Sequence, residues 1–425
     1  MKLGLGNIFV KDNGRGKKLI APTAPSLDLQ FAATKSLTAV KGPTPILTRA
    51  STATYVDVYG NRQTAAINAP RFHHDESLNG STATATSSIY SGTFYFSGVL
   101  DHDDVGIFFP YYSSSDQQAL LFYSFLEQNW YIFYKEQIAV ASNFQKQLKS
   151  LGLLIEAPST NIVLNSNNTK SVGQTIITFT STGSGVYALS CDAASNGATA
   201  IFNNYSEDTY TITPMIRFFT VFSVDEGSEC TLTVDTGSVK NIQVENIDAT
   251  GPTSYIPTGA TPVTRSADVC TISGSNFSGF YNGPAGTLVS EFTSSASSNA
   301  SYVTLSNGNI AANSIHFDND PAAPSSRAVY YSGSSVVASL VLGAQSAAGT
   351  TEKFATAYAS SDYAASRNGG TVVTDNSGIV PQSMIQMNIG SDERTEGIYY
   401  TNSCIASIKY YKSRLSNSML KTLST

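Results

Sequence analysis

Short runs with apolar residues at every second position recur along this chain, and they constrain its fold more than any other feature. Leu27-Asp-Leu-Gln-Phe31 has this spacing, which is typical of a half-buried β-strand. Similar runs follow from about residue 165 to residue 411, separated by Gly, Asn, Ser and Pro. Charged residues, which include the strong helix formers Lys and Glu, make up only 13% of the sequence. We therefore expect an all-β protein with tandem β-sandwiches of the jelly-roll type and a small inserted antiparallel β module.

Changes in charge, aromatic content and apolar alternation divide the 425 residues into five expected parts. A basic arm precedes an N-terminal β element, which is interrupted by an aromatic-rich insert, and two β-sandwiches follow. Only the last stretch, Ser416–Leu423, has a helical pattern, and Ser416 is its expected N-cap. The expected boundaries are 1–26 for the arm, 27–85 plus 149–164 for the N-terminal β element, 86–148 for the insert, 165–262 for the first sandwich and 263–425 for the second.

The N-terminal arm is basic, whereas the whole chain has a formal net charge of −6. Residues 1–18 hold five basic side chains and one acidic side chain, which gives this segment a net charge of +4. Such an arm is either a solvated tail or a segment that docks on an acidic neighbour. The candidate anchoring residues are Lys11, Arg15, Lys17 and Lys18. The acidic balance of the whole chain argues against nucleic-acid binding, and no apolar run is long enough to insert into a membrane.

Residues with catalytic or metal-binding chemistry are sparse in this sequence. The four His residues occur in no zinc-protease motif, and neither a nucleophile elbow nor a phosphate loop is present. The densest polar cluster contains Asp101, Asp103 and Asp104, which form either a β-turn tip or a cation site. The segment His316–Asp320 has the same two interpretations, and we prefer the turn for both. We expect no catalytic residue and no cofactor.

The insert at 86–148 is the best candidate for a binding surface. The run Trp130-Tyr-Ile-Phe-Tyr134 places large apolar side chains on both faces of an expected strand. At least one face must therefore meet a neighbouring subunit, a second domain or a ligand such as a glycan. We favour subunit contact. The candidate glycan-binding or interface residues are Trp130, Tyr131, Tyr134, Tyr111 and Tyr112.

Three groups of short strings resemble tailed-phage virion appendage proteins, which include fiber, spike and decoration proteins. The first group consists of Leu27–Phe31, Leu47–Ser51, Ala53–Asp57, Gly60, Ala69–Phe72, Gly152–Glu156 and Thr160–Asn161. The second resembles the end of a carbohydrate-binding-module-like sandwich and consists of Gln243–Glu245, Pro252–Pro257 and Thr264–Asp268. The third resembles a concanavalin A-like lectin/glucanase domain and consists of Gly286–Glu291 and Ile405–Asn417. The insert departs from the family's usual spacing because it splits the first group.

The resemblance implies a fold and association with a virion, but it carries over no sugar-binding residue. The first hypothesis is a structural protein of a fiber- or spike-like appendage that contacts host surface glycans. The alternative is a capsid decoration or head fiber protein without a receptor role, and the third hypothesis is a polysaccharide depolymerase. The implied partners are capsid, portal or tail proteins and further copies of this chain, commonly three. The implied location is the virion, after assembly in the host cytoplasm. Arg49, Arg71 and Glu156 are expected to be buried ion-pair or hydrogen-bond anchors of the N-terminal element rather than catalysts.

Overall fold

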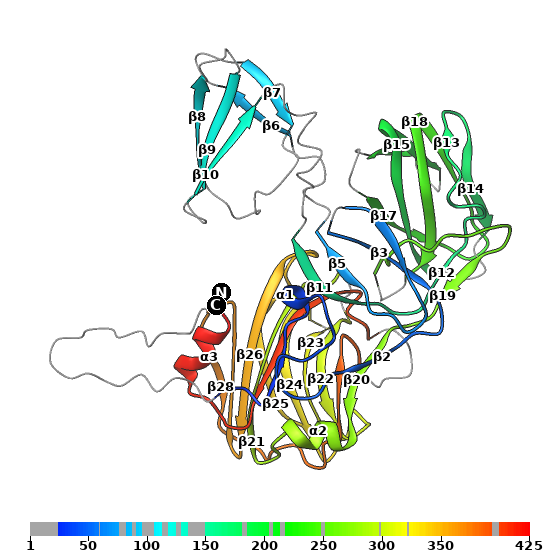
Figure 1. Ribbon diagram of the computed structural model, residues 1–425. Helices are drawn as coiled ribbons and strands as arrows, with labels where there is room; N and C mark the ends of the chain where they lie inside the picture. Colours follow the sequence, from blue (N-terminus) through cyan, green and yellow to red (C-terminus); the bar gives the residue numbers. More distant parts are fainter. Residues whose placement is uncertain are drawn as a thin grey trace.

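The computed structural model describes residues 24–58, 60–75, 149–180, 185–194, 211–212, 217–247, 251–296, 299–320, 323–392 and 399–425. It describes the backbone alone of residues 195–203 and 207–210 and of five strands within 82–134. Antiparallel strands dominate the described residues, which also contain three short helices (Figure 1). The prediction of an all-β fold is therefore confirmed. No helix among the described residues is both long and apolar enough to cross a membrane.

The larger unit is a sandwich of two antiparallel sheets, drawn in the lower part of Figure 1. Its first sheet has eight strands in the order β28-β27-β26-β21-β30-β11-β5, and β1 also pairs with β30. The bounds of these strands are β1 (Leu27–Leu29), β5 (Phe72–His74), β11 (Ser150–Ile155), β21 (Ala285–Thr293), β26 (Thr351–Ala359), β27 (Asp362–Arg367), β28 (Val373–Asp375) and β30 (Ser403–Tyr411).

The opposing sheet has seven strands in the order β2-β20-β29-β22-β23-β24-β25. These strands are β2 (Ile46–Thr48), β20 (Val269–Ser273), β22 (Ser301–Ser306), β23 (Ser314–Asp320), β24 (Ser325–Ser332), β25 (Ser335–Ala344) and β29 (Gln386–Ile389). Alternate side chains of both sheets point inward and share one core. Phe292 of β21 stacks on Tyr302 of β22, for example, with ring centroids 3.7 Å apart.

Strands from the expected N-terminal β element take part in both sheets of this sandwich. β1, β5 and β11 belong to the eight-stranded sheet, and β2 forms the edge of the seven-stranded sheet. The boundaries expected from the sequence assigned these strands to a different part of the chain from residues 263–425. In the structure, backbone hydrogen bonds place them in the same two sheets as the strands of residues 263–425. Local periodicity indicates a strand but not its partner, because pairing depends on residues hundreds of positions away. The expected domain boundaries themselves stay a prediction.

Three short helices accompany the strands of the described residues: α1 (Phe31–Thr34), α2 (Gly274–Phe280) and α3 (Asn417–Leu423). The predicted helix at the C-terminal end is confirmed, because the Ser416 side chain accepts a hydrogen bond from the Met419 N–H at 3.3 Å. Neither α1 nor α2 was predicted, and the sequence of α2 has two Gly residues and no strong helix former. α2 buries Phe277 and Phe280 in the sandwich core, so tertiary packing overrides its poor helix propensity.

The second unit, drawn in green at the upper right of Figure 1, contains one six-stranded antiparallel sheet. Its strands are β13 (Lys170–Ser171), β14 (Thr175–Thr180), β15 (Gly185–Asn203), β16 (Glu207–Ile212), β17 (Phe218–Val224) and β18 (Glu229–Asn246). Register shifts interrupt the pairing of the two long strands, β15 and β18, near their middle. Such irregularities bend strands. Leu189 and Val244 from one half therefore share a core with Leu232 and Val234 from the other half.

Residues 82–134 contain an antiparallel hairpin, whose first strand begins before the expected start of the insert, and a three-stranded antiparallel sheet. The hairpin pairs β6 (Thr82–Thr86) with β7 (Ser91–Tyr95), and the sheet has the order β10-β9-β8. These last strands are β8 (Gly106–Tyr112), β9 (Gln118–Ser124) and β10 (Asn129–Tyr134). The antiparallel pairing agrees with the expectation from the sequence, but β8, which contains Pro110, was not among the expected strands. A proline is tolerated there because β8 lies at the sheet edge.

Candidate functional site

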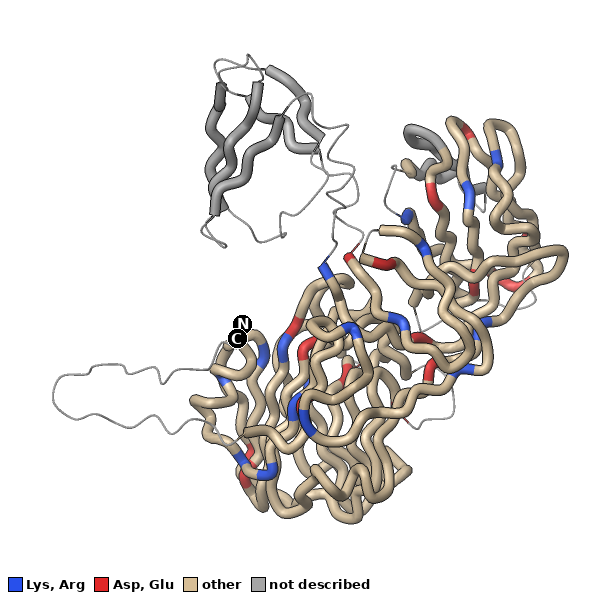
Figure 2. The backbone as a smooth tube through the Cα atoms, viewed as in Figure 1, with Lys and Arg blue, Asp and Glu red and all other residues tan. Residues whose placement is uncertain are grey.

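A cluster of buried charges lies where the sandwich meets the second unit, and Figure 2 shows both signs of charge close together there. Arg71 Nη1 lies 2.6 Å from Glu156, and Arg49 Nη1 lies 2.9 Å from Asp268. Arg71 also donates a hydrogen bond to Asp268, and Arg265 lies 3.7 Å from Glu156. All five side chains are at most 3% exposed. The expectation that Arg49, Arg71 and Glu156 are buried ion-pair or hydrogen-bond anchors is confirmed, and the contacts are ion pairs.

The electrostatics of this cluster favour permanent charges over proton transfer. Burial alone raises the pKa of Glu156, but Arg265, Arg71 and a hydrogen bond from Ser254 lower that pKa to about 2. Burial lowers the pKa of Arg71, whereas Glu156 and Asp268 raise it above its usual value. A general acid needs a pKa near the working pH. The cluster therefore has the properties of a structural anchor that holds the ends of β2, β5, β11 and β20 together.

Ser314, His316 and Asp318 project from the same face of β23 because they alternate along the strand. Ser314 Oγ lies 3.1 Å from His316 Nδ1, and His316 Nε2 lies 3.4 Å from Asp318. These are the residue types of a nucleophilic triad. However, each side chain is almost completely buried, and the Ser314 hydroxyl donates to the Ile310 carbonyl at 2.7 Å. A substrate cannot reach this serine in the folded protein.

The turn interpretation of His316–Asp320 is wrong, because this segment lies within β23. Its two carboxylates pair with Arg327 on the neighbouring strand β24, at 2.9 Å for Asp318 and 2.6 Å for Asp320. A cross-strand ion pair explains the acidic pattern in place of the turn. Within the described part of the chain, no group of three or more His, Cys, Asp or Glu residues could hold a metal ion.

His73 on β5 is expected to make the stability of the folded chain depend on pH. Its Nδ1 accepts a hydrogen bond from the Val56 N–H at 3.2 Å, which requires the neutral ring. Burial lowers the pKa of His73 from 6.5 to about 4. Between pH 6.5 and 4 the unfolded chain therefore binds a proton that the folded chain does not, and stability falls as the pH falls. We expect His73 to contribute a loss of up to about 3 kcal/mol across this window, at about 1.4 kcal/mol per pKa unit.

Urea unfolding at several pH values between 7 and 4 measures this loss. The matched variant His73→Asn keeps an acceptor for the Val56 N–H but cannot take up a proton in this range. Its free energy of unfolding is expected to fall less steeply than that of the wild type. If the free energy of unfolding falls equally steeply with pH in both proteins, the assignment to His73 is contradicted. Burial also lowers the pKa of the neighbouring His74, but both proteins contain His74, so its contribution cancels in the comparison.

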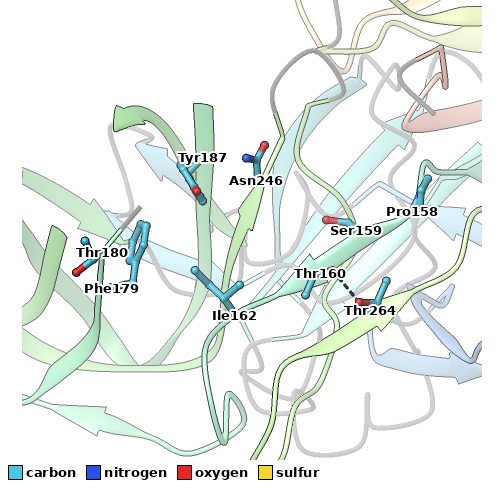
Figure 3. Close-up of a pocket in the computed structure, with 9 residues that line it drawn as sticks. All are labelled: Pro158, Ser159, Thr160, Ile162, Phe179, Thr180, Tyr187, Asn246 and Thr264. Carbon is cyan, nitrogen blue, oxygen red and sulfur yellow. Dashed lines mark hydrogen bonds between the residues drawn. The ribbon is translucent and has the colours of Figure 1, made fainter. Parts of the chain in front are cut away.

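An open cleft of about 510 Å³ lies at one end of the second unit, between its sheet and a two-stranded ladder (Figure 3). The ladder pairs β12 (Ser159–Asn161) with β19 (Val263–Arg265). The nine residues that line the cleft come from both sides. They are Pro158, Ser159, Thr160, Ile162, Phe179, Thr180, Tyr187, Asn246 and Thr264.

The aromatic side of this cleft follows from strand pairing. Tyr187 on β15 lies opposite Asn246 on β18, and the next inward-facing pair is Leu189 with Val244 in the core. Tyr187 and Asn246 therefore lie on the same face of the sheet as the core residues Leu189 and Val244, but at the end of the strands, where this face is exposed to solvent. The ring of Phe179 on β14 lies 5.2 Å from the ring of Tyr187, at 50° to it. Both rings pack against the core on one side, which fixes their orientation.

Asn161 fixes the opposite wall. Its Nδ2 donates to the carbonyls of Ile242 at 3.0 Å and Ile256 at 2.8 Å, and its Oδ1 accepts from the Val163 N–H at 3.0 Å and the Val244 N–H at 3.2 Å. These bonds use the whole hydrogen-bonding capacity of the amide and hold β12 beside β18. The wall in front of Asn161 presents hydroxyl groups, because Thr160 Oγ1 and Thr264 Oγ1 lie 2.7 Å apart, as Figure 3 shows.

The cleft has the chemistry of a sugar-binding site. Binding sites usually combine apolar and aromatic walls with a few well-placed polar groups. Here the Phe179 and Tyr187 rings can contact the C–H face of a sugar, while hydroxyls and the exposed Asn246 amide can bind its hydroxyl groups. None of the nine lining residues is a carboxylic acid. The pair of carboxyl groups that glycoside hydrolysis usually requires is therefore not among them.

The residues proposed from the sequence lie elsewhere. Tyr111 and Tyr112 are on β8, and Trp130, Tyr131 and Tyr134 are on β10, but only the backbone of these strands is described. Their role in binding a glycan or a subunit stays a prediction. The arm residues and the aspartates of the expected turn also lie outside the described residues. These are Lys11, Arg15, Lys17, Lys18, Asp101, Asp103 and Asp104.

Sequence reasoning did not find Phe179, Tyr187 or Asn246. Tyr187 lies in a predicted strand, and Asn246 directly follows the string Gln243–Glu245, but nothing in either stretch marks a binding residue. Only the pairing register of β15 with β18 brings Tyr187 beside Asn246. The available signal was an aromatic residue at the end of an alternating strand, which occurs at many positions of this chain.

No family model and no curated protein matches this chain. Solved structures with some similarity include the CBM40 of Ruminococcus gnavus IT-sialidase bound to α2,3-sialyllactose, at 18% identity over 34% of this chain and 83% of that chain, with a TM-score of 0.29. They also include a pentraxin from Limulus polyphemus (10% identity, 33% and 71% coverage, TM-score 0.26) and mouse laminin α1 domains LG4-5 (8% identity, 61% and 90% coverage, TM-score 0.26). The TM-scores are low, and no ligand or function of this chain follows from them.

Proposed function

We propose that this chain is a non-enzymatic structural protein of a tailed-phage virion that contacts glycans through the cleft between β12 and β15. The observation that carries the glycan-binding part is the arrangement of two fixed aromatic rings opposite a wall of hydroxyl groups. The resemblance of the sequence strings supports the virion part. Capsid, portal or tail proteins and further copies of this chain are the proposed partners.

The strings that carry this resemblance coincide with the buried charge cluster. Arg49, Arg71 and Glu156 belong to the first group of strings, and Arg265 and Asp268 belong to the second. The strings thus supply all five charged residues of the cluster, which lie on or beside β2, β5, β11, β19 and β20. Because the same strings place β12 and β19, they also support a fixed position for the proposed glycan cleft relative to the sandwich.

Glycan binding is tested with the purified full chain on a glycan array, followed by calorimetry with the best ligand. We expect Tyr187→Ala to weaken binding at least about tenfold, because the variant loses the ring on which the sugar packs. Tyr187→Phe keeps the ring and should keep most of the affinity. The control is Phe219→Ala, which removes an aromatic side chain that is 52% exposed on the same sheet but outside this cleft. Unchanged affinity in a folded Tyr187→Ala protein would contradict the assignment of the cleft.

The virion part is tested by locating the chain in purified particles with a labelled antibody. Signal at the tail supports an appendage that contacts the host, and signal over the head supports the decoration alternative. Absence from the particle overturns the virion proposal. Incubation with bacterial polysaccharides, followed by an assay for new reducing ends, tests the non-enzymatic part, and release of such ends would favour the depolymerase hypothesis.

A further inference from the structure

The polar groups of the cleft are all uncharged, but a buried carboxylate lies directly behind one of them. Glu245 precedes Asn246 on β18 and is completely buried. Ser159, which lines the cleft, donates its hydroxyl proton to Glu245 Oε2 at 2.5 Å. The negative charge of Glu245 is therefore one hydroxyl group away from the space that a ligand would occupy.

Neutral groups supply all of the hydrogen bonds that Glu245 accepts among the described residues. Besides Ser159, the donors are Gln243 Nε2 at 2.7 Å, the Thr253 N–H at 2.9 Å and Thr253 Oγ1 at 2.7 Å. Arg265 interacts electrostatically with Glu245, but it lies 3.7 Å from Glu156 and 3.8 Å from Asp268 and is shared with them. Of these carboxylates, Glu245 is the one bonded to a residue that lines the cleft.

The hydrogen bond to Glu245 also sets what Ser159 can do toward a ligand. A hydroxyl group has a single proton, and here Glu245 takes it. Ser159 can therefore only accept a hydrogen bond from a ligand. A sugar hydroxyl can donate that bond, whereas a carboxylate or sulfate group has only acceptors. An anionic group at this position would face a lone pair with a negative charge behind it, and because Glu245 is buried, salt screens that charge little.

We propose, as an extension that rests on the glycan-binding function proposed above, that the cleft takes uncharged sugar residues and rejects acidic ones through the Ser159–Glu245 pair. Its ligand class is neutral hexoses and N-acetylhexosamines. Sugars that carry a carboxylate or sulfate group are excluded, because like charges in proximity lower affinity and suppress wrong partners. Ser159 is a binding residue, and Glu245 is a positioning residue that acts through it.

The test compares matched pairs of glycans on the wild-type full chain, so that it does not depend on any variant. Galactose oligomers are paired with galacturonate oligomers, and N-acetylglucosamine oligomers with hyaluronan fragments, by calorimetry at one fixed salt concentration. We expect the neutral member of a pair to bind at least about tenfold tighter. If the acidic member binds equally or more tightly, the selectivity proposal is overturned while glycan binding stands. If neither member of any pair binds, both proposals fail.

Two variants assign the selectivity to its residues. Glu245→Gln removes the charge and should improve binding of the acidic glycan by at least about threefold, with little change for the neutral one. The matched control is Glu291→Gln, which removes a 33% exposed charge on β21 of the sandwich and should leave the ratio unchanged. Ser159→Ala keeps the carboxylate of Glu245 but removes the hydroxyl oxygen that accepts a hydrogen bond, so it should lower the affinity for the neutral glycan. An unchanged ratio in a folded Glu245→Gln protein overturns the role of Glu245.

Discussion

Replacing Arg71 by Met is expected to lower the free energy of unfolding by about 3–5 kcal/mol, because the change leaves buried carboxylates with fewer partners. Arg71 donates to Glu156 at 2.6 Å, to the Thr54 carbonyl at 2.9 Å and to Ser254 Oγ at 2.9 Å, and it also bonds to Asp268. Met has a similar length and can fill the space. The loss therefore reports mainly on the charge and its hydrogen bonds rather than on a cavity.

Thermal and urea unfolding of the full chain measure this effect, together with hydrogen exchange at β5 and β11, which flank the cluster. Because the chain has two units, the two transitions should be followed separately. Arg414→Met is the matched control, since Arg414 pairs at 2.8 Å with Asp362, whose side chain is 48% exposed. A partly exposed ion pair of this kind contributes at most about 1 kcal/mol to the free energy of unfolding. If Arg71→Met lowers the free energy of unfolding no more than Arg414→Met does, the cluster is not a structural anchor of the fold.

The fold class could be predicted because it depends on local patterns. Alternation in Leu27–Phe31 is a property of five neighbouring residues, and β1 forms there. The N-cap of α3 is equally local, since Ser416 bonds to Met419 three residues later. The anchoring residues Arg71 and Glu156 were identified through the resemblance of their strings to known proteins. Periodicity alone would not have indicated that the two side chains meet.

The candidate site could not be predicted because it depends on register and on separated segments. Tyr187 and Asn246 face the cleft only because β15 pairs with β18 in one particular register, and a shift by one residue would turn both away. Ser159 and Thr264 reach the cleft through a third pairing, between β12 and β19. The abundant aromatic residues of the insert instead led to the prediction that Trp130 binds a glycan or a subunit, and the side chain of Trp130 is not described by the structure.

Gly152 is a position at which a single added methyl group is expected to destabilise the fold strongly. It has a φ of +107°, a conformation that residues with a Cβ rarely adopt. A Cβ at this position would overlap the Ile405 carbonyl oxygen and would lie 2.7 Å from Ala406 Cα. Both atoms belong to the backbone of β30, the central partner of β11 and β21, and they cannot rotate away as a side chain could.

We therefore expect Gly152→Ala to lower the free energy of unfolding by at least about 3 kcal/mol, in the range typical of strained or overpacked backbone positions. Gly173→Ala is the matched control, because Gly173 also has a positive φ, +74°, but a methyl group added there would have no atom within 4 Å. That control should cost only the conformational strain, about 1–2 kcal/mol. The difference between the two variants in urea unfolding isolates the close approach of β11 to β30. Equal losses would mean that the two strands can separate freely at this point, and the packing of β11 against β30 would then not be what holds the N-terminal strands in the sandwich.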